Sequence, residues 1–136
     1  MLGHDVLEEF HDHQCSVLDV EDLDITDKDK VIEVISKIKP DWVINCVAYT
    51  EVDNCETNQK RALKVNGEAV GYIAQACNEI NADLVHISTD YVFDGKNKNG
   101  YNEDDKKNPI NAYGESKSLG EDLIIENMKK FLKHKT

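Results

Sequence analysis

The chain has 136 residues, a formal net charge of −11 and a hydrophobic content of 40%. This length is typical of one ordinary domain with its own core. An acidic chain lacks the basic patches that nucleic acids and anionic membranes require, so neither is expected as a partner. The four cysteines form no C-x-x-C pair, and we therefore expect reduced thiols and a cytoplasmic location.

The first third of the chain predicts a helix followed by a strand. Residues 3–13 place Val6, Leu7 and Phe10 on one helical face. The histidines at 4, 11 and 13 lack the i,i+4 spacing of a helical metal site, and no metal is expected. The apolar run at 15–20 predicts a short strand, and an acidic segment follows it.

The remaining elements alternate in type. Thr26 or Asp27 is expected to cap a helix that Pro40 ends, and a buried strand is predicted at 42–46. A long helix is predicted over 56–81, in which Gly67 and Gly71 indicate close packing against a neighbour. The run 84–88 predicts another buried strand, 94–108 a polar loop on the substrate side, and 112–133 the last helix. Such alternation predicts an α/β fold with a parallel sheet.

Three side chains near the predicted strand at 84–88 suggest a chemistry. Thr89 follows the strand, and Tyr113 and Lys117 share one helical face through their i,i+4 spacing. A nearby ammonium would lower the pKa of a phenol toward the range where general acid–base catalysis is efficient. A tyrosine, a lysine and a hydroxyl so arranged are suited to proton transfer at a carbonyl or alcohol oxygen, coupled to hydride transfer with a nicotinamide cofactor.

Several segments together resemble the dTDP-4-dehydrorhamnose reductase family of the extended short-chain dehydrogenases/reductases. They are VINCVAYTEVDNCE at 43–56, ISTDYVFDG at 87–95 and YGESK at 113–117. The resemblance implies a Rossmann-type, doubly wound parallel sheet that lacks its first strand and the C-terminal substrate-binding part. Residues 1–136 would then be a partial NAD(P)-binding domain, inactive by itself. The expected reaction is the reduction of a dTDP-4-keto-6-deoxysugar, in a full-length protein that is a possible homodimer.

The resemblance also assigns roles to residues. Thr89, Tyr113 and Lys117 would be catalytic, Thr89 and Asp90 would bind the dTDP-sugar, and Asn66 would have a structural or catalytic role. The implied cofactor-binding residues are Met1, Leu2, Gly3, Asp19, Asp24, Ile25, Ala48, Tyr49, Thr50, Ile87, Tyr113 and Lys117.

The cofactor and the reaction each have an alternative. An acid after the second strand, here Asp19, can bind the ribose 2′-hydroxyl, whereas Glu21 and Asp22 are equally well explained as a solvated loop. No Lys or Arg lies between Gly3 and Asp27 to balance a 2′-phosphate, which favours NADH over NADPH. A related sugar-nucleotide epimerase or dehydratase, or a regulatory subunit like that of methionine adenosyltransferase, is an alternative function.

Overall fold

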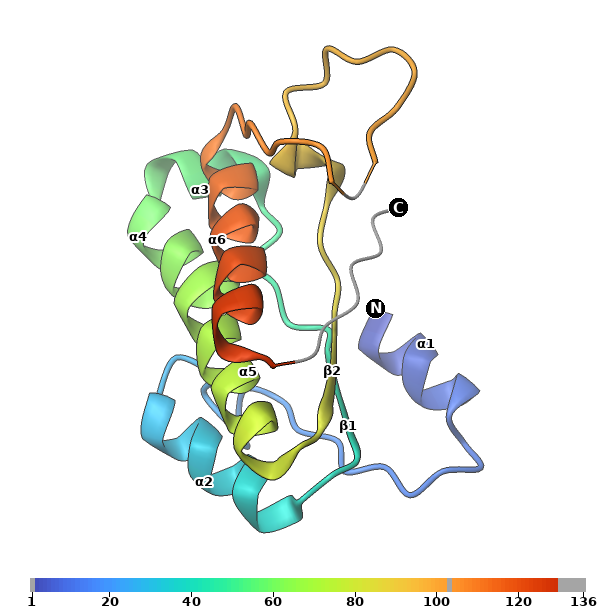
Figure 1. Cartoon of the computed structure of the whole chain (residues 1–136). Helices are drawn as coiled ribbons and strands as arrows, with labels where there is room; N and C mark the ends of the chain where they lie inside the picture. The colour runs from blue at the N-terminus through green and yellow to red at the C-terminus, as the bar shows by residue number, and fades with distance from the viewer. Residues whose placement is uncertain (1, 103, 130–136) are drawn as a thin grey trace.

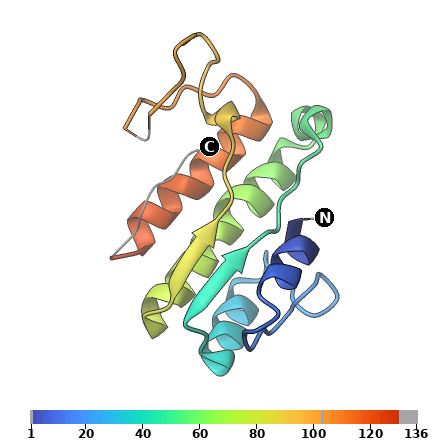
Figure 2. The same cartoon turned by 90° about the vertical axis from the view of Figure 1, so that its right-hand side faces the viewer.

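The computed structural model describes residues 2–102 and 104–129, and it shows an α/β architecture. Two strands lie side by side, with helices α2, α5 and α6 on one side and α1 on the other (Figures 1 and 2). Within the described ranges, none of the helices has the length and apolar character needed to cross a membrane. The elements are α1 (Leu2–Glu9), α2 (Lys28–Ile38), β1 (Trp42–Asn45), α3 (Val52–Thr57), α4 (Gln59–Ala62), the π-helix η1 (Leu63–Glu68), α5 (Ala69–Ile80), β2 (Asp83–His86), the 3₁₀-helix η2 (Asp90–Val92) and α6 (Ala112–Asn127).

The two strands form a parallel pair, as expected. Their register runs from Trp42 opposite Asp83 to Asn45 opposite His86. The helical segment between them carries the chain back over the sheet, which is the crossover that a parallel pair requires. Both strands therefore end at the same edge, and the segments that follow β1 and β2 emerge there together (Figure 2).

The strand predicted at 15–20 does not form, and this prediction is wrong. Among the described residues the sheet contains only β1 and β2. A strand needs a neighbour that exchanges backbone hydrogen bonds with it, and the described chain offers residues 15–20 none. Their apolar side chains remain exposed, with Val17 at 64% and Val20 at 74% of full accessibility.

Helix α2 forms as the sequence predicts and closes the core. The Asp27 carboxylate caps its first turn by accepting the Lys30 backbone N–H at 3.2 Å. Val31 and Ile35 face inward at the spacing of one helical turn. They join a buried cluster that also contains Leu23, Ile73, Ala76, Cys77 and Ala82.

The helix predicted over 56–81 is interrupted, so its continuity was predicted wrongly. The backbone at Asn58 leaves helical geometry, with φ −126° and ψ 47°, and separates α3 from α4. After α4, the six residues Leu63–Glu68 form the π-helix η1, and α5 begins at Ala69. A π turn holds one residue more than an α turn. The spacing of apolar residues in the sequence does not indicate such a turn, so it was not predicted.

Helix α6 packs closely on η1 and α5, which confirms the expectation for two glycines. A Cβ added to Gly67 would lie 2.6 Å from the Leu119 Cδ2 atom. The corresponding position at Gly71 is 3.1 Å from Leu123. Helix α6 ends at Asn127 rather than at 133, and residues 130–133 of the predicted helix lie outside the described residues.

Candidate functional site

The candidate site lies where the two strands end. Ala48, Tyr49 and Thr50 follow β1, and Ile87 and Thr89 follow β2. Parallel pairing brings both segments to one edge of the sheet. Ligands of open α/β sheets bind at this edge.

Helix α6 starts directly beside the end of β2. The Asn111 side chain caps it by accepting the Gly114 N–H at 2.7 Å. A Cβ at Gly114 would lie only 2.2 Å from the Tyr91 carbonyl oxygen, so only glycine allows this approach. From the other side, Glu56 of α3 accepts the Ala112 N–H at 2.7 Å. These contacts fix the first turn of α6, which carries Tyr113.

Tyr113 meets Thr89, as the sequence predicted. The ring of Tyr113 also packs edge-on against Tyr91, with 5.8 Å between the ring centroids. Burial raises the pKa of the Tyr113 phenol above its ordinary value, and a hydrogen bond with the Thr89 hydroxyl opposes that rise. The phenol is protonated at neutral pH in either case, and the rise makes it a weaker acid than a free phenol.

Lys117 lies on the same helix as Tyr113, as expected, but it does not have the expected effect on the pKa of Tyr113. Its ammonium was expected to lower the pKa of Tyr113, whereas the structure shows that pKa raised. Lys117 is 2% exposed, and its Nζ atom donates to the Ile87 carbonyl and lies 3.3 Å from the His86 Nε2 atom. Burial lowers the pKa of Lys117 to about 8, although the charge of Glu121 acts in the opposite direction. The lysine is thus bound under the end of β2.

Asn66 links the segments that follow β1 to helix α6. Its Oδ1 atom accepts the Tyr49 N–H at 2.7 Å, and its Nδ2 atom donates to the Tyr49 carbonyl at 2.9 Å. The same Nδ2 atom donates to the Ser116 Oγ atom at 3.0 Å, and that hydroxyl donates to the Tyr113 carbonyl at 2.7 Å. Asn66 is fully buried, so a structural role is clear in its contacts. Beneath the loop, the Cys55 thiol donates to the Tyr49 carbonyl at 3.7 Å.

A second set of contacts holds the end of β2 from the outside. The Ser88 hydroxyl donates to the Glu121 carboxylate at 2.5 Å. Lys107 lies 3.5 Å from the same carboxylate and 2.7 Å from that of Asp122. The loop before α6 and the helix itself therefore fix the segment that presents Thr89.

Asp90 and the loop at 94–108, predicted to lie on the substrate side, follow the end of β2. Asp90 is exposed, and its carboxylate accepts the Thr89 hydroxyl at 3.3 Å. The loop at 94–108 is braced by stacking of Tyr101 on Phe93, whose ring centroids are 4.1 Å apart. Hydrogen bonds from Tyr101, from the Lys96 backbone and from Asn108 lower the pKa of Asp94 to about 2.

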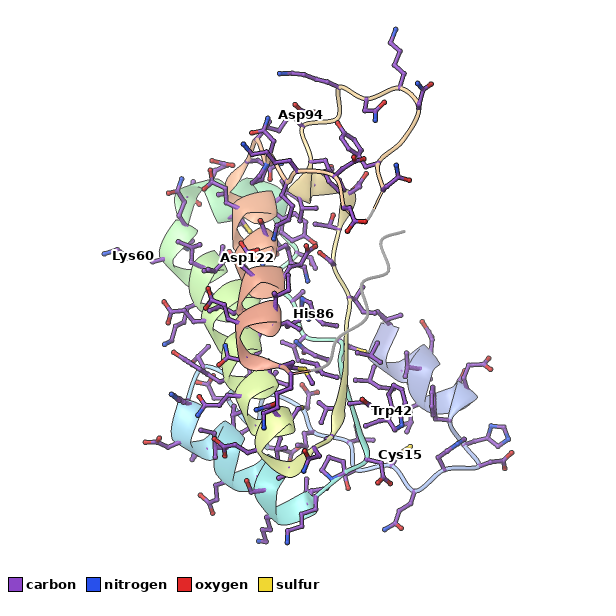
Figure 3. All side chains as sticks on the ribbon, in the orientation of Figure 1. Cys15, Trp42, Lys60, His86, Asp94 and Asp122 are labelled. Carbon is purple, nitrogen blue, oxygen red and sulfur yellow. The ribbon has the colours of Figure 1, made fainter. Side chains whose placement is uncertain are left out.

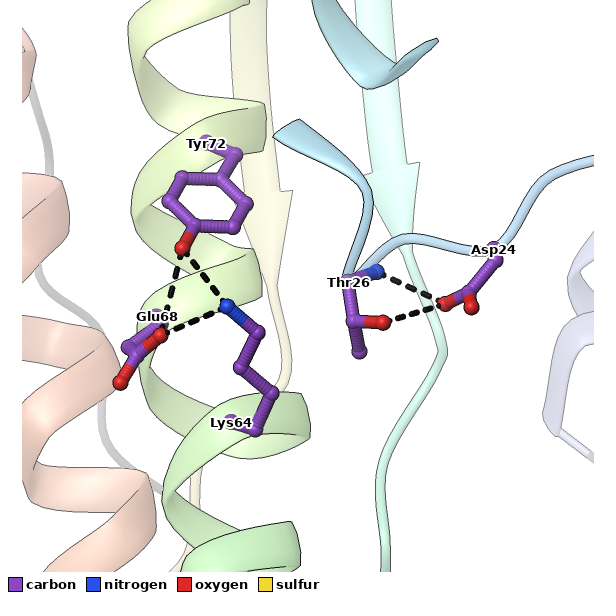
Figure 4. Close-up of polar contacts among 5 residues, drawn as sticks. All are labelled: Asp24, Thr26, Lys64, Glu68 and Tyr72. Carbon is purple, nitrogen blue, oxygen red and sulfur yellow. Dashed lines mark hydrogen bonds and ion pairs between the residues drawn. The ribbon is translucent and has the colours of Figure 1, made fainter. Parts of the chain in front are cut away.

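The predicted adenosine-side residues form local contacts. The Asp19 carboxylate accepts the Val20 N–H at 2.7 Å within a turn. Asp24 accepts both the backbone N–H and the hydroxyl of Thr26 (Figure 4), and these bonds lower the pKa of Asp24. Ile25 packs against the main core cluster.

The charges of two lysines act on the carboxylate of Asp24. The charges of Lys30 and Lys64 lower the pKa of Asp24 further, so basic residues from outside the segment 3–27 contribute here. Lys64 itself is bonded to Glu68 at 2.9 Å and to the Tyr72 hydroxyl at 3.0 Å (Figure 4). The spacing along the sequence did not reveal this proximity.

The N-terminal cofactor-binding residues are placed only in part. Met1 lies outside the described residues. Leu2 and Gly3 open helix α1, and a Cβ at Gly3 would be 3.6 Å from that of Cys46. The start of α1 therefore approaches the end of β1. Within the described part of the chain, His, Cys, Asp and Glu residues form no group of three or more that could hold a metal.

Sequence reasoning missed two residues of the site. Asn45 and His86 face each other as the last pair of the two strands, and the Asn45 Nδ2 atom lies 3.1 Å from the His86 Nδ1 atom. The side chain of His86, the last residue of β2, lies between that strand and α6 (Figure 3), and its Nε2 atom is 3.3 Å from Lys117 Nζ. The available signal was a polar residue inside each of two apolar runs.

Comparison with known proteins gives several relatives. The chain is 42% identical over 123 residues to a probable low-salt glycan biosynthesis reductase of Haloferax volcanii, covering 90% of this chain and 41% of that protein. It is 42% identical over 113 residues to the dTDP-4-dehydrorhamnose reductase of Aggregatibacter actinomycetemcomitans, covering 83% of this chain and 38% of that protein. The chain thus spans about two fifths of the length of these curated relatives.

Solved structures agree with the fold. The dTDP-4-dehydrorhamnose reductase of Bacillus anthracis, in complex with NADP, matches with a TM-score of 0.91 and 38% identity, covering 95% of this chain and 47% of that one. The orthologue of Clostridium acetobutylicum matches with a TM-score of 0.88 and 39% identity, covering 93% and 46%. The fold is therefore of the Rossmann type found in these reductases. The family model described as the RmlD substrate binding domain matches residues 1–135, and the chain belongs to this family.

Proposed function

We propose that residues 1–136 form the cofactor-binding and catalytic part of a nicotinamide-dependent reductase, which converts the C4 ketone of a dTDP-4-keto-6-deoxysugar to an alcohol. The observation that carries the proposal is the contact between Thr89 and Tyr113 at the end of β2. The names of the relatives support the substrate class. The four free thiols agree with the cytoplasmic location that we infer.

Tyr113 is the proposed acid. The phenol is protonated at neutral pH, so it can transfer a proton to the oxygen of the ketone as negative charge develops there. Thr89, bonded to the phenol, presents a second hydroxyl to the same point. Asp90 lies next to it on the exposed side, where a sugar hydroxyl could bind.

The residues present fit a nicotinamide dinucleotide. Ala48 and Tyr49 are half-buried and Ile87 is 43% exposed at neighbouring strand ends, which offers a partly apolar surface for a flat ring. The start of α1 approaches this edge at Cys46, and the free N–H groups of a helix N-terminus favour phosphates. When bound, the reduced nicotinamide would supply the hydride. We propose NADH as the preferred form, because Asp19 is exposed and its carboxylate disfavours a 2′-phosphate.

The test uses a chimaera in which residues 1–136 replace the matching segment of a dTDP-4-dehydrorhamnose reductase. Oxidation of NADH or NADPH with a dTDP-4-keto-6-deoxysugar is followed by absorbance, and the sugar product is identified. We expect reduction at C4. A folded chimaera that binds the dinucleotide as its parent does, yet gives no turnover, would overturn the proposal.

A further inference from the structure

The starting point is the arrangement of hydrogen bonds around His86. The Asn45 Oδ1 atom accepts the Val47 N–H at 3.0 Å, which orients the amide of Asn45. The Nδ2 atom of that amide therefore faces His86 Nδ1, at 3.1 Å. An amide Nδ2 can only donate, so Nδ1 of the ring must accept.

The protonation state of His86 follows from its surroundings. Burial, together with the charge of Lys117, lowers the pKa of His86 to about 3, so the ring is neutral at neutral pH. A neutral imidazole carries one proton. Because Nδ1 accepts from Asn45, that proton is on Nε2, which lies 3.3 Å from Lys117 Nζ.

This arrangement determines what Lys117 can do. An N–H on His86 Nε2 can donate to the lone pair of a neutral amine, whereas an ammonium would face it as a second donor. The amine can at the same time donate to the Ile87 carbonyl. The other charged group acting on Lys117 is Glu121, on the same helix, which also contacts Lys107 at 3.5 Å.

We propose that His86 is a positioning residue of the site: Asn45 fixes its tautomer, and the resulting Nε2–H favours the neutral amine of Lys117 over its ammonium at the end of β2. This inference rests on the proposed function for its importance in turnover, but its geometry stands independently. The lowered pKa of Lys117 agrees with it. The arrangement poises the lysine to exchange a proton close to neutral pH, next to the segment that carries Thr89.

The experiment is NMR of the chain labelled with ¹⁵N in histidine and ¹³C in lysine. The ¹⁵N shifts of His86 show which ring nitrogen carries the proton, and the ¹³Cε shift of Lys117 gives its titration midpoint. We expect the Nε2–H tautomer at pH 7. An Nδ1–H tautomer, or a charged ring, overturns the proposal even if no variant folds.

The substitution Asn45→Asp tests whether residue 45 determines the tautomer of His86. The new carboxylate only accepts, so it should draw the proton to His86 Nδ1 and leave Nε2 to accept from a Lys117 ammonium. The titration midpoint of Lys117 should rise by about one pH unit or more. Asn99→Asp adds the same charge in the exposed loop and should leave both signals unchanged.

A double substitution separates the tautomer from simple charge attraction. In a His86→Phe background, Asn45→Asp should move the Lys117 midpoint by less than half as much, because no ring remains to transmit the change. An equal movement in both backgrounds, or none in the chain with His86, refutes the role of His86. None of these readouts needs turnover, so a failed reductase assay leaves them interpretable.

Discussion

The side-chain amide of Asn66 binds both backbone groups of Tyr49, accepting its N–H at 2.7 Å and donating to its carbonyl at 2.9 Å. Asn66→Leu keeps the volume of the side chain but leaves these groups unpaired. Burying unpaired polar groups costs about 1–3 kcal/mol each, so we expect the free energy of unfolding to fall by roughly 3 kcal/mol. Urea denaturation measures the change. Asn99→Leu, in the exposed loop, serves as the control, and an equal loss in both variants contradicts the role of Asn66.

The close approach of Gly114 to the Tyr91 carbonyl leads to a second prediction. Gly114→Ala should gain about 1 kcal/mol of helix propensity but introduces a Cβ at 2.2 Å from that oxygen. We expect a net destabilisation of about 1–3 kcal/mol, the usual cost of overpacking. Gly3→Ala, whose Cβ would meet only an ordinary contact at 3.6 Å, is the control in the same denaturation assay. A Gly114→Ala variant as stable as the control would show that the loop yields without cost.

The proposed role of Tyr113 as the acid predicts a large effect on turnover. In the chimaera, Tyr113→Phe keeps the ring and removes the proton, so kcat should fall by roughly 10²–10⁴-fold while the dissociation constant of the dinucleotide stays nearly unchanged. Tyr72→Phe removes a phenol that is bonded to Lys64 and Glu68 and should leave kcat unchanged. A Tyr113→Phe variant that retains more than about half of the parent turnover excludes Tyr113 from the reaction.

The proposed preference for NADH rests on the charge of Asp19, which is exposed. Asp19→Asn preserves the oxygen that accepts the Val20 N–H and removes the negative charge. A unit charge at about 4 Å in water is worth about 1 kcal/mol, so the ratio of kcat/KM for NADPH over that for NADH should rise by about fivefold. Asp53→Asn, on the exposed side of α3, controls for net charge. An unaltered chimaera that clearly prefers NADPH, or an unchanged ratio in Asp19→Asn, contradicts the assignment of Asp19.

The lowered pKa of Lys117 predicts how the free energy of unfolding depends on pH. Its pKa is 10.5 in an unfolded chain and about 8 in the folded one, so between these values the unfolded state holds a proton that the folded state has lost. Stability from this group therefore rises with pH across that window, by on the order of 3 kcal/mol. Lys117→Met should remove this rise, as judged by the free energies of unfolding at pH 8 and pH 10.

Lys64→Met is the matched control for that measurement. Hydrogen bonds to Tyr72 and Glu68 raise the pKa of Lys64, so this lysine keeps its proton in both states over most of the window. Its replacement should leave the slope of stability against pH unchanged. If both variants retain the slope of the parent chain, Lys117 titrates outside the stated range.

The sequence predicted the two strands, helix α2 and the meeting of Thr89 with Tyr113, because apolar periodicity and strand-end position are local signals. It did not predict the fate of residues 15–20, since a strand depends on a partner that local sequence does not reveal. The position of Lys117 was missed for a similar reason. Helical spacing puts it on the same face as Tyr113, but the carbonyl of Ile87 and the ring of His86, both from β2 and its end, decide where its amine binds.

The π-helical turn at Leu63–Glu68 sets the phase between two halves of one helical rod. Asn66 must face Tyr49, while Gly71, five residues later, must face Leu123. A π turn holds one residue more than an α turn, so deleting one residue from it would restore α geometry and leave the two halves in phase. Both contacts could then be kept. In an alignment of this family, a one-residue gap between positions 63 and 68 would therefore be compatible with an unchanged site, whereas the same gap in an α-helical segment would rotate one half against the other by about 100°.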